Sequence, residues 1–480
     1  MLHSREWKLE RINHVLDLSN RGPYLDEESW DLEKVAATTR QMVKKYGITW
    51  DPERLIPDDS KTLAGIFQAG IELASQLGVY MRDTQRIVSY RLEEIQLGLE
   101  SMPMELTMGE GKDARTIFAR KVTDDRPPLV WGGSPGTSIP EDMFLRIEMS
   151  YAKESNIDML STGSLASVDG REVRTGTPLE LMATQKELKL LRKAITNAGR
   201  PGMGLMGAES SVSAYGDLSV ANPAFLRPCD AHLIPMQNEL KIDHTSMMKA
   251  ANSIEYGMRN SSLACVIVGG LGGDAPGSAV LNIASFALSN LVCLADFHSC
   301  HPIHIRHVAT TTRSVLWVES AVIQAFSQYA PCIIFGDIYP KSGALTKELL
   351  YEVAANAIVI TVSGGHLKGP ASADGLLPNC TGLEARWMGE VGQAVARQRL
   401  DHDEANTLVN KLIHKYEHVF DLPEGNPGKP FDQAYDLETI QPKLEWSSMY
   451  EEVKEEVRAM GLNTLEESGS ESVIGPNSSG

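Results

Sequence analysis

The stretch CIIFGDIYP, residues 332–340, joins an apolar, β-branched run to a glycine, an acid and a tyrosine. A short apolar run bounded by turn residues predicts a buried parallel strand, which here ends at Asp337. Seven similar runs predict the other strands, near Leu129, Asp158, Gly202, His232, Cys265, Ile303 and Ala357. Because amphipathic helical segments follow most of these runs, we predict an α/β fold, a (β/α)8 barrel of the TIM type.

The predicted barrel spans residues 127–400, with helices at 178–198, 245–258, 312–329 and 383–397. Residues 1–126 are expected to form an N-terminal helical region and residues 401–463 a C-terminal helical region. The polar residues 464–480 are expected to form a disordered tail. Residues 207–230 show no helical periodicity, so we expect a functional loop there, able to cover a pocket.

Composition and charge limit the partners. The chain has 45 Lys and Arg against 63 Asp and Glu, and a net charge of -18 repels nucleic acid and anionic membranes. Residues 278–297 are the most apolar segment, but their Asn and Ser residues favour a buried helix over a membrane span. The charged first ten residues indicate no export signal, and six scattered cysteines are typical of reduced thiols in the cytoplasm.

Polar residues at predicted strand ends form the candidate site. Asp337 follows one strand and Glu209 another, and barrel enzymes carry their active sites at the carboxyl-terminal strand ends. Side chains alternate along a strand, so His304 and Arg306 share a face and are expected to point into the barrel. A helix-capping acid and a structural His–Arg pair are the competing interpretations.

Two further motifs suggest other ligands. Gly270, Gly272 and Ala275 have the spacing of a dinucleotide fingerprint, but Pro276 follows at once and the motif does not open a Rossmann unit. Residues 298–307 contain four histidines and a cysteine, which suggests zinc, yet strand alternation keeps these histidines off a single metal. We therefore expect no bound metal and no permanently bound cofactor.

Several longer motifs occur in one order along the chain. They are GRPGMG (199–204), NELKID (238–243), HIR (304–306), TGLEARWMGEV (381–391) and DTQRIV (83–88). Together they resemble the monomethylamine:corrinoid methyltransferases, over about residues 30–462. The resemblance implies a (β/α)8 barrel and a homo-oligomer, a hexamer. It also implies methyl transfer from an amine to the Co(I) corrinoid (cobalamin) of a separate small corrinoid protein.

The resemblance places Met206 where the family has pyrrolysine, encoded by an in-frame amber codon. Leu233 and Leu263 fall where the family has glutamates, and Asp337 where it has a glutamine, whereas Tyr339 and Glu209 match. Three interpretations stay open. The chain is a pyrrolysine-independent relative that acts on another N-methyl compound, including quaternary ones; or position 206 is a recoded amber position; or methyl transfer is lost and Met206 fills the core.

We therefore expect a methyltransferase that acts on a methylated amine. The expected catalytic residues are Met206, Glu209, Asp337 and Tyr339, and the expected substrate-binding residues are His304, Arg306, Leu233 and Leu263. A thioether has no electrophilic carbon to capture an amine, but a quaternary nitrogen leaves as a neutral amine, and Asp337 can pair with its charge. Two alternatives remain: a barrel hydrolase or lyase that uses His304 and Asp337, and a non-catalytic binder of small N-methylated cations.

Overall fold

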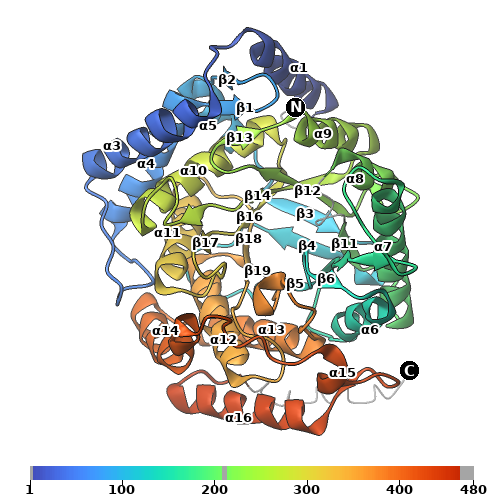
Figure 1. The fold of residues 1–480 in the computed structure, drawn as a ribbon. Helices are drawn as coiled ribbons and strands as arrows, with labels where there is room; N and C mark the ends of the chain where they lie inside the picture. The colour runs from blue at the N-terminus through green and yellow to red at the C-terminus, as the bar shows by residue number, and fades with distance from the viewer. Residues whose placement is uncertain (1–3, 208–212, 465–480) are drawn as a thin grey trace, which may run out of the picture.

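A closed barrel of eight parallel strands forms the centre of the computed structural model, which describes residues 4–207 and 213–464 (Figure 1). The strand order around the barrel is β11-β12-β14-β16-β18-β19-β5-β7. The strands are β5 (Val130–Gly133), β7 (Met159–Ser161), β11 (Gly204–Gly207), β12 (Ala231–Met236), β14 (Arg259–Ala264), β16 (Phe297–Cys300), β18 (Ile334–Asp337) and β19 (His366–Lys368). The helices that follow them in turn are α6 (Glu141–Ala152), α7 (Pro178–Asn197), α8 (Ala214–Val220), α9 (His244–Tyr256), α10 (Ala275–Val292), α11 (Arg313–Tyr329), α12 (Lys347–Ser363) and α13 (Gly382–Gln398). The predicted (β/α)8 barrel is confirmed.

Five predicted strands lie where the sequence places them, and three predictions are wrong. The runs expected as barrel strands near Cys265 and Ile303 form β15 (Ile267–Val268) and β17 (Ile303–His304), which pair with each other outside the barrel, and the barrel strands are β14 and β16, which end at Ala264 and Cys300. The apolar residues near Ala357 belong to α12, and the eighth strand is β19. Serines and histidines interrupt the apolar runs of β14 and β16, whereas α12 is buried on all sides and shows no polar stripe.

The four helices predicted in the barrel correspond to α7, α9, α11 and α13. The expectation of no helix within residues 207–230 is wrong, because α8 lies there. Its seven residues are too few to show a clear apolar period. Glu209 belongs to residues 208–212, which lie outside the described residues, and so does the predicted tail from residue 465 onward.

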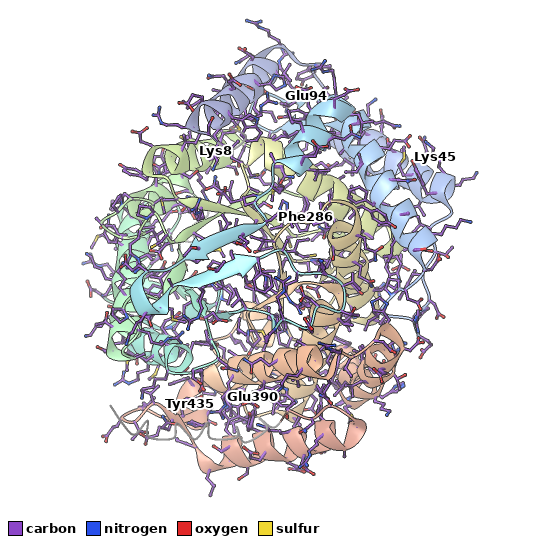
Figure 2. The ribbon with its side chains drawn as sticks, turned by 180° about the vertical axis from the view of Figure 1, so that it is seen from behind. Lys8, Lys45, Glu94, Phe286, Glu390 and Tyr435 are labelled. Atoms are coloured by element: carbon purple, nitrogen blue, oxygen red, sulfur yellow. The ribbon has the colours of Figure 1, made fainter. Side chains whose placement is uncertain are left out.

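The segment before the barrel covers its side and one of its ends. The helices of this segment are α1 (Arg5–Arg21), α2 (Glu27–Ser29), η1 (Trp30–Ala36), α3 (Ala37–Tyr46), α4 (Ser60–Leu77) and α5 (Leu92–Glu100). The hairpin of β3 (Glu105–Met108) and β4 (Arg115–Phe118) crosses the amino-terminal end of the barrel, which faces the viewer in Figure 2. Leu106, Met108 and Ile117 of the hairpin share a buried cluster with Trp131 and Met206 of the barrel interior. Apolar packing therefore closes this end.

The segment after the barrel is helical, and α14 (His402–Tyr416) and α16 (Leu444–Met460) contact α12. Short strands lie outside the barrel in small sheets: β1 (Val79–Met81), β2 (Arg86–Val88), β6 (Ser138–Ile139), β8 (Ser164–Leu165), β9 (Ser167–Val168), β10 (Arg171–Glu172), β13 (Lys241–Ile242), β15 (Ile267–Val268), β17 (Ile303–His304), β20 (Tyr435–Asp436) and β21 (Gln441–Pro442). The remaining short helices are η2 (Gly111–Asp113), η3 (Ala373–Gly375), η4 (Glu417–Asp421) and α15 (Phe431–Ala434). Residues 1–126 thus contain strands as well as helices, and the domain boundaries at residues 126 and 400 stay predictions.

The apolar segment at residues 278–297 lies mostly in α10, whose residues are almost all buried. This helix packs against α4 and α11, as the prediction of a core helix requires. Among the described helices it is the one that is long and apolar enough to cross a membrane, and 94% of it is buried inside the protein.

Candidate active site

Two charged side chains meet at the carboxyl-terminal end of the barrel. Asp337 ends β18 and Lys368 ends β19, and the two residues are register partners on adjacent strands. Lys368 Nζ lies 3.4 Å from Asp337 Oδ2, and the two side chains are only 1% and 4% exposed. This end of the barrel therefore holds a buried ion pair.

His301 and Tyr339 extend this polar row. His301 directly follows β16, and its Nδ1 lies 3.6 Å from Asp337 Oδ2. Burial, with a contribution from the Lys368 ammonium, lowers the pKa of His301 to about 3, so the imidazole is neutral near pH 7. The Tyr339 ring meets the His301 ring edge-on at 4.3 Å, and its hydroxyl donates a 2.6 Å hydrogen bond to the Pro135 carbonyl. Strands β16, β18 and β19 thus present one polar row, which we call the Asp337 row.

The barrel interior before this row is apolar, and its buried cluster includes Phe297 of β16 and Phe335 of β18. Met206 of β11, Leu233 of β12 and Leu263 of β14 belong to or pack against the buried cluster of the barrel core. Met206 is fully buried and Leu233 is 7% exposed, whereas Leu263 keeps more of its surface accessible. These three residues, which we call the apolar wall, bring together three positions where the sequence predicts site residues. Glu209 follows β11 but lies outside the described residues.

The barrel mouth is partly accessible beside β12 and β14. Pro235, Leu263 and Cys265 keep part of their surface exposed, although they lie on or directly after central barrel strands. Desolvation raises the pKa of the Cys265 thiol to about 12, and the carboxyl groups of Glu239 and Asp337 add to the shift. The thiol is therefore protonated at neutral pH and is a poor nucleophile. Accessible surface at strand ends of this kind is where barrel enzymes admit their ligands.

Sequence reasoning missed four residues of the mouth: Lys368, His301, Cys265 and Glu239. The sequence does not predict Lys368 at a strand end, because it places the eighth strand near Ala357, which lies in α12. The histidine-rich segment suggests only a zinc ligand at His301, and Cys265 falls at the start of a predicted strand. Glu239, whose pKa burial raises to about 7, stands within the motif NELKID, and this motif was the available signal.

His304 and Arg306 do not point into the barrel, so this expectation is wrong. His304 belongs to β17, which pairs with β15 beyond the carboxyl-terminal end of the barrel strands. Arg306 is exposed, and the His304 ring stacks on His307 at 4.6 Å. Both histidines line a surface groove of about 410 Å³ together with Phe420. The alternation of side chains would point His304 and Arg306 into the barrel only if their strand were a barrel strand. β17 is not part of the barrel.

Comparison with known proteins identifies the family. The model of the family described as "Monomethylamine methyltransferase MtmB" matches residues 11–462. The chain belongs to the MtmB family. A curated MtmB protein of Methanosarcina mazei is 33% identical over 452 residues, which cover 93% of this chain and 97% of that protein.

Solved structures agree with this assignment to the MtmB family. The crystal structure of the Methanosarcina barkeri monomethylamine methyltransferase superimposes with a TM-score of 0.91 and 31% sequence identity. A crystal structure of a hydroxylamine MtmB complex gives the same TM-score and identity. Each alignment covers 94% of this chain and 98% of the solved chain, so the similarity extends over the barrel and the flanking helices.

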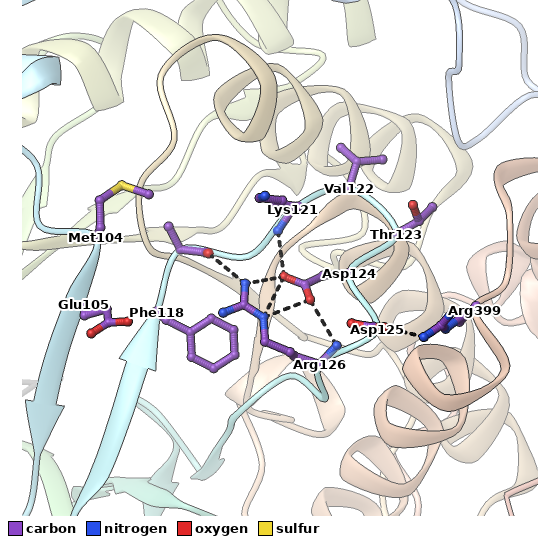
Figure 3. A pocket seen from close by; sticks show the side chains of 11 residues that line it. Met104, Glu105, Phe118, Lys121, Val122, Thr123, Asp124, Asp125, Arg126 and Arg399 are labelled. Atoms are coloured by element: carbon purple, nitrogen blue, oxygen red, sulfur yellow. Dashed lines mark hydrogen bonds and ion pairs between the residues drawn. The ribbon is translucent and has the colours of Figure 1, made fainter.

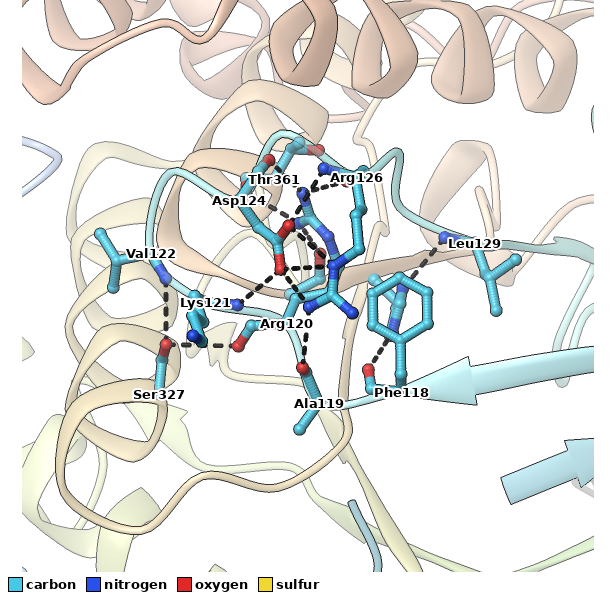
Figure 4. Close-up of polar contacts among 12 residues, drawn as sticks. Phe118, Ala119, Arg120, Lys121, Val122, Asp124, Arg126, Leu129, Ser327 and Thr361 are labelled. Carbon is cyan, nitrogen blue, oxygen red and sulfur yellow. Dashed lines mark hydrogen bonds and ion pairs between the residues drawn. The ribbon is translucent and has the colours of Figure 1, made fainter. Parts of the chain in front are cut away.

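A larger hollow lies at the opposite end of this MtmB-family barrel. It has a volume of about 830 Å³ and is lined by residues that precede β5, such as Asp124 and Arg126, and by Arg399 (Figure 3). Asp124 binds Arg126 at 2.6 Å, and the Arg120 guanidinium donates to four backbone carbonyls (Figure 4). These contacts hold the loop that leads into β5. Because barrel enzymes act at the carboxyl-terminal strand ends, we assign this hollow no role in the chemistry.

Among residues 4–207 and 213–464, no three His, Cys, Asp or Glu side chains are grouped so that they could hold a metal ion.

Proposed function

We propose that this protein transfers a methyl group from an N-methylated amine to a corrinoid carried by a partner protein. Membership of the MtmB family supports the reaction class, and the match extends over residues 11–462. The observation that carries the proposal for the site is the arrangement of the barrel mouth. There the buried Asp337 row stands at the carboxyl-terminal strand ends, and the apolar wall reaches it through Leu263, which lies in register with Ser299, two residues before His301.

The identity of residue 206 decides which donors the site can use. A neutral methylamine leaves as an amide anion and needs capture or protonation first, and the Met206 thioether has no electrophilic carbon for capture. A quaternary nitrogen keeps the electron pair of the broken C–N bond and leaves as a neutral amine, without prior capture or protonation. Asp337 provides a carboxylate for such a nitrogen, the neutral His301 adds no positive charge, and the Lys368 ammonium is the one cation of the Asp337 row.

We assign roles to the proposed site residues from their positions. Asp337 holds the charged nitrogen, and Tyr339 fixes the mouth through its bond to Pro135. Glu209, which lies outside the described residues, stays a proposed catalytic acid on the family resemblance alone. Leu233, Leu263 and Met206 contact the methyl groups and exclude water, which strengthens the electrostatic interactions of Asp337.

The corrinoid supplies the Co(I) nucleophile that accepts the methyl group. The accessible surface at Pro235 and Cys265 leaves the mouth open to a partner that brings this group. His304 and Arg306 lie beyond the barrel strands on the same face. We therefore place them in the docking surface for the small corrinoid protein and not in the substrate pocket.

Incubation of the protein with cob(I)alamin and a panel of methylated amines tests the proposal. We expect methylation of the cobalamin by at least one quaternary donor and not by monomethylamine. Asp337→Asn is expected to lower the rate by about 100-fold, because it removes the charge beside the nitrogen. Transfer from none of the donors contradicts the proposed function.

The mass of the peptide that contains residue 206 checks the premise of this proposal. A methionine mass is expected. A pyrrolysine mass would restore an electrophile to the site, and monomethylamine would then become the expected donor.

A further inference from the structure

We infer that the methyl donor is zwitterionic, an N-methylated amino acid or betaine whose carboxylate is bound by Lys368 while its nitrogen lies beside Asp337. This inference rests on the proposed function, because it names the substrate class of the same site.

The first observation is the position of the Lys368 ammonium. Lys368 ends β19, next to Asp337 at the end of β18, and its side chain is 1% exposed. Burying an ammonium is costly, and a buried ion pair contributes little net stability compared with apolar residues of similar volume. An ion pair at the catalytic end of a barrel is therefore better explained by ligand recognition than by stability.

The second observation concerns the balance of charge in the Asp337 row. Asp337 has the Lys368 ammonium at 3.4 Å, and His301 beside it is neutral near pH 7. A simple cation that approaches Asp337 also approaches Lys368, so attraction and repulsion act over similar distances and largely cancel. A simple anion that approaches Lys368 is likewise repelled by the Asp337 carboxylate.

A zwitterion gains from both members of the pair. With its ammonium toward Asp337 and its carboxylate toward Lys368, the four charges alternate in sign. In a betaine or an N-methyl amino acid one carbon separates the nitrogen from the carboxyl group. That spacing suits a pair whose charged atoms are 3.4 Å apart.

The third observation is the apolar wall, whose Leu263 lies in register with Ser299, two residues before His301 of the Asp337 row. Met206, Leu233 and Leu263 offer apolar surface to N-methyl groups and no hydrogen-bond partner for a carboxylate. The carboxylate of the donor is therefore directed toward Lys368, and the methyl groups face the wall.

Calorimetric titration of the whole chain tests the inference. The ligands are trimethylglycine, N-methylglycine, trimethylglycine methyl ester and tetramethylammonium. The ester keeps the quaternary nitrogen but lacks the negative charge. We expect trimethylglycine or N-methylglycine to bind at least about tenfold more tightly than the ester and tetramethylammonium.

Two variants assign this preference to Lys368. Lys368→Met keeps the length of the side chain and removes its charge, so the preference for the zwitterion is expected to disappear. Lys454→Met is the matched control, because Lys454 of α16 is largely buried against Glu390 of α13, outside the barrel interior, and this variant should keep the preference. If Lys368→Met does not fold, the affinities of the four ligands for the unaltered chain still test whether a zwitterion is preferred.

Three results would overturn the inference: no binding of either zwitterion, equal binding of the ester, or an unchanged preference in a folded Lys368→Met. Methyl transfer to cob(I)alamin, measured in parallel, separates this outcome from failure of the proposed function. Transfer from tetramethylammonium without any preference for zwitterions supports the methyltransferase and defeats the inference. Zwitterion-selective binding without transfer from any donor supports the recognition by Lys368 and defeats the methyltransferase.

Discussion

Met206 packs in the interior of the barrel, one residue before the end of β11. Its side chain is fully buried in the cluster that contains Trp131, Phe335 and the hairpin residue Met108. A thioether fills irregular gaps between aromatic rings and aliphatic side chains well. Leu233 and Leu263 continue the same apolar surface toward the mouth. The residue at position 206 therefore contributes shape and apolar contact where an electrophile would contribute covalent capture.

Truncation of Met206 tests its place in the core. Met206→Ala is expected to lower the free energy of unfolding by about 2–5 kcal/mol, because it leaves a cavity in a closely packed cluster. Met206→Leu, which nearly conserves the volume, should cost less than about 1.5 kcal/mol. Urea denaturation measures both. An alanine variant as stable as the unaltered chain would show that the space around residue 206 is open.

At the scale of the element, α8 is held to the barrel by buried charges. Asp217 on α8 contacts His232 Nε2 on β12 and Lys249 Nζ on α9, and all three side chains are at most 7% exposed. Asp217 thus links α8 to both β12 and α9 through buried polar contacts. Helix α8 begins shortly after residues 208–212, which carry Glu209. The contacts fix α8 against β12 and α9.

Removal of Asp217 is expected to be strongly destabilising. Asp217→Ala leaves Lys249 buried without its carboxylate and should lower the free energy of unfolding by about 3–5 kcal/mol. The double variant Asp217→Ala/Lys249→Met removes the stranded charge as well and should recover part of this loss. Urea denaturation of the two single variants and the double variant measures the coupling. Strictly additive effects would contradict a buried ion pair.

The elements also show where sequence reasoning reaches its limit. β18 and β12 were predictable because apolar residues run through them, whereas Ser261, Ser262 and His298 interrupt the runs of β14 and β16. Two of these polar residues pair across the strands, since Ser262 Oγ lies 2.6 Å from His298 Nδ1. Polar residues that satisfy one another inside the fold look like loop residues in the sequence.

For the whole molecule, the barrel was predictable, but only part of the candidate site was. Asp337 stands out because it ends a clear strand, and Leu233 and Leu263 follow from the family resemblance, which places glutamates at these positions. His301 and Lys368 reach Asp337 only through the closure of β16, β18 and β19 side by side, which no local pattern encodes. His304 and Arg306 have the right residue types but lie on β17 and after it, outside the barrel.

Buried carboxyl groups make the stability of the whole molecule depend on pH. Burial raises the pKa of Glu187, Glu239, Glu352 and Glu384 to about 7. Because the folded state binds these protons more tightly than the unfolded state, each group stabilises the fold below pH 4.5. That contribution is lost as the pH rises to 7. Burial lowers the pKa of His298, His301 and His366 to about 3. These three groups destabilise the fold as the pH falls below 6.5, because the unfolded state then binds protons that the folded state does not.

Comparison of one variant with the unaltered chain separates these opposing effects. Glu187 lies outside the candidate site, and its Oε1 accepts a 2.7 Å hydrogen bond from the Leu165 backbone N–H. Glu187→Gln keeps a carbonyl acceptor and cannot ionise. Between pH 5 and pH 8 the variant should therefore gain about 2–3 kcal/mol of unfolding free energy relative to the unaltered chain. Urea denaturation at several pH values measures this difference, and a difference that does not change with pH would show that Glu187 is ionised in the folded protein throughout.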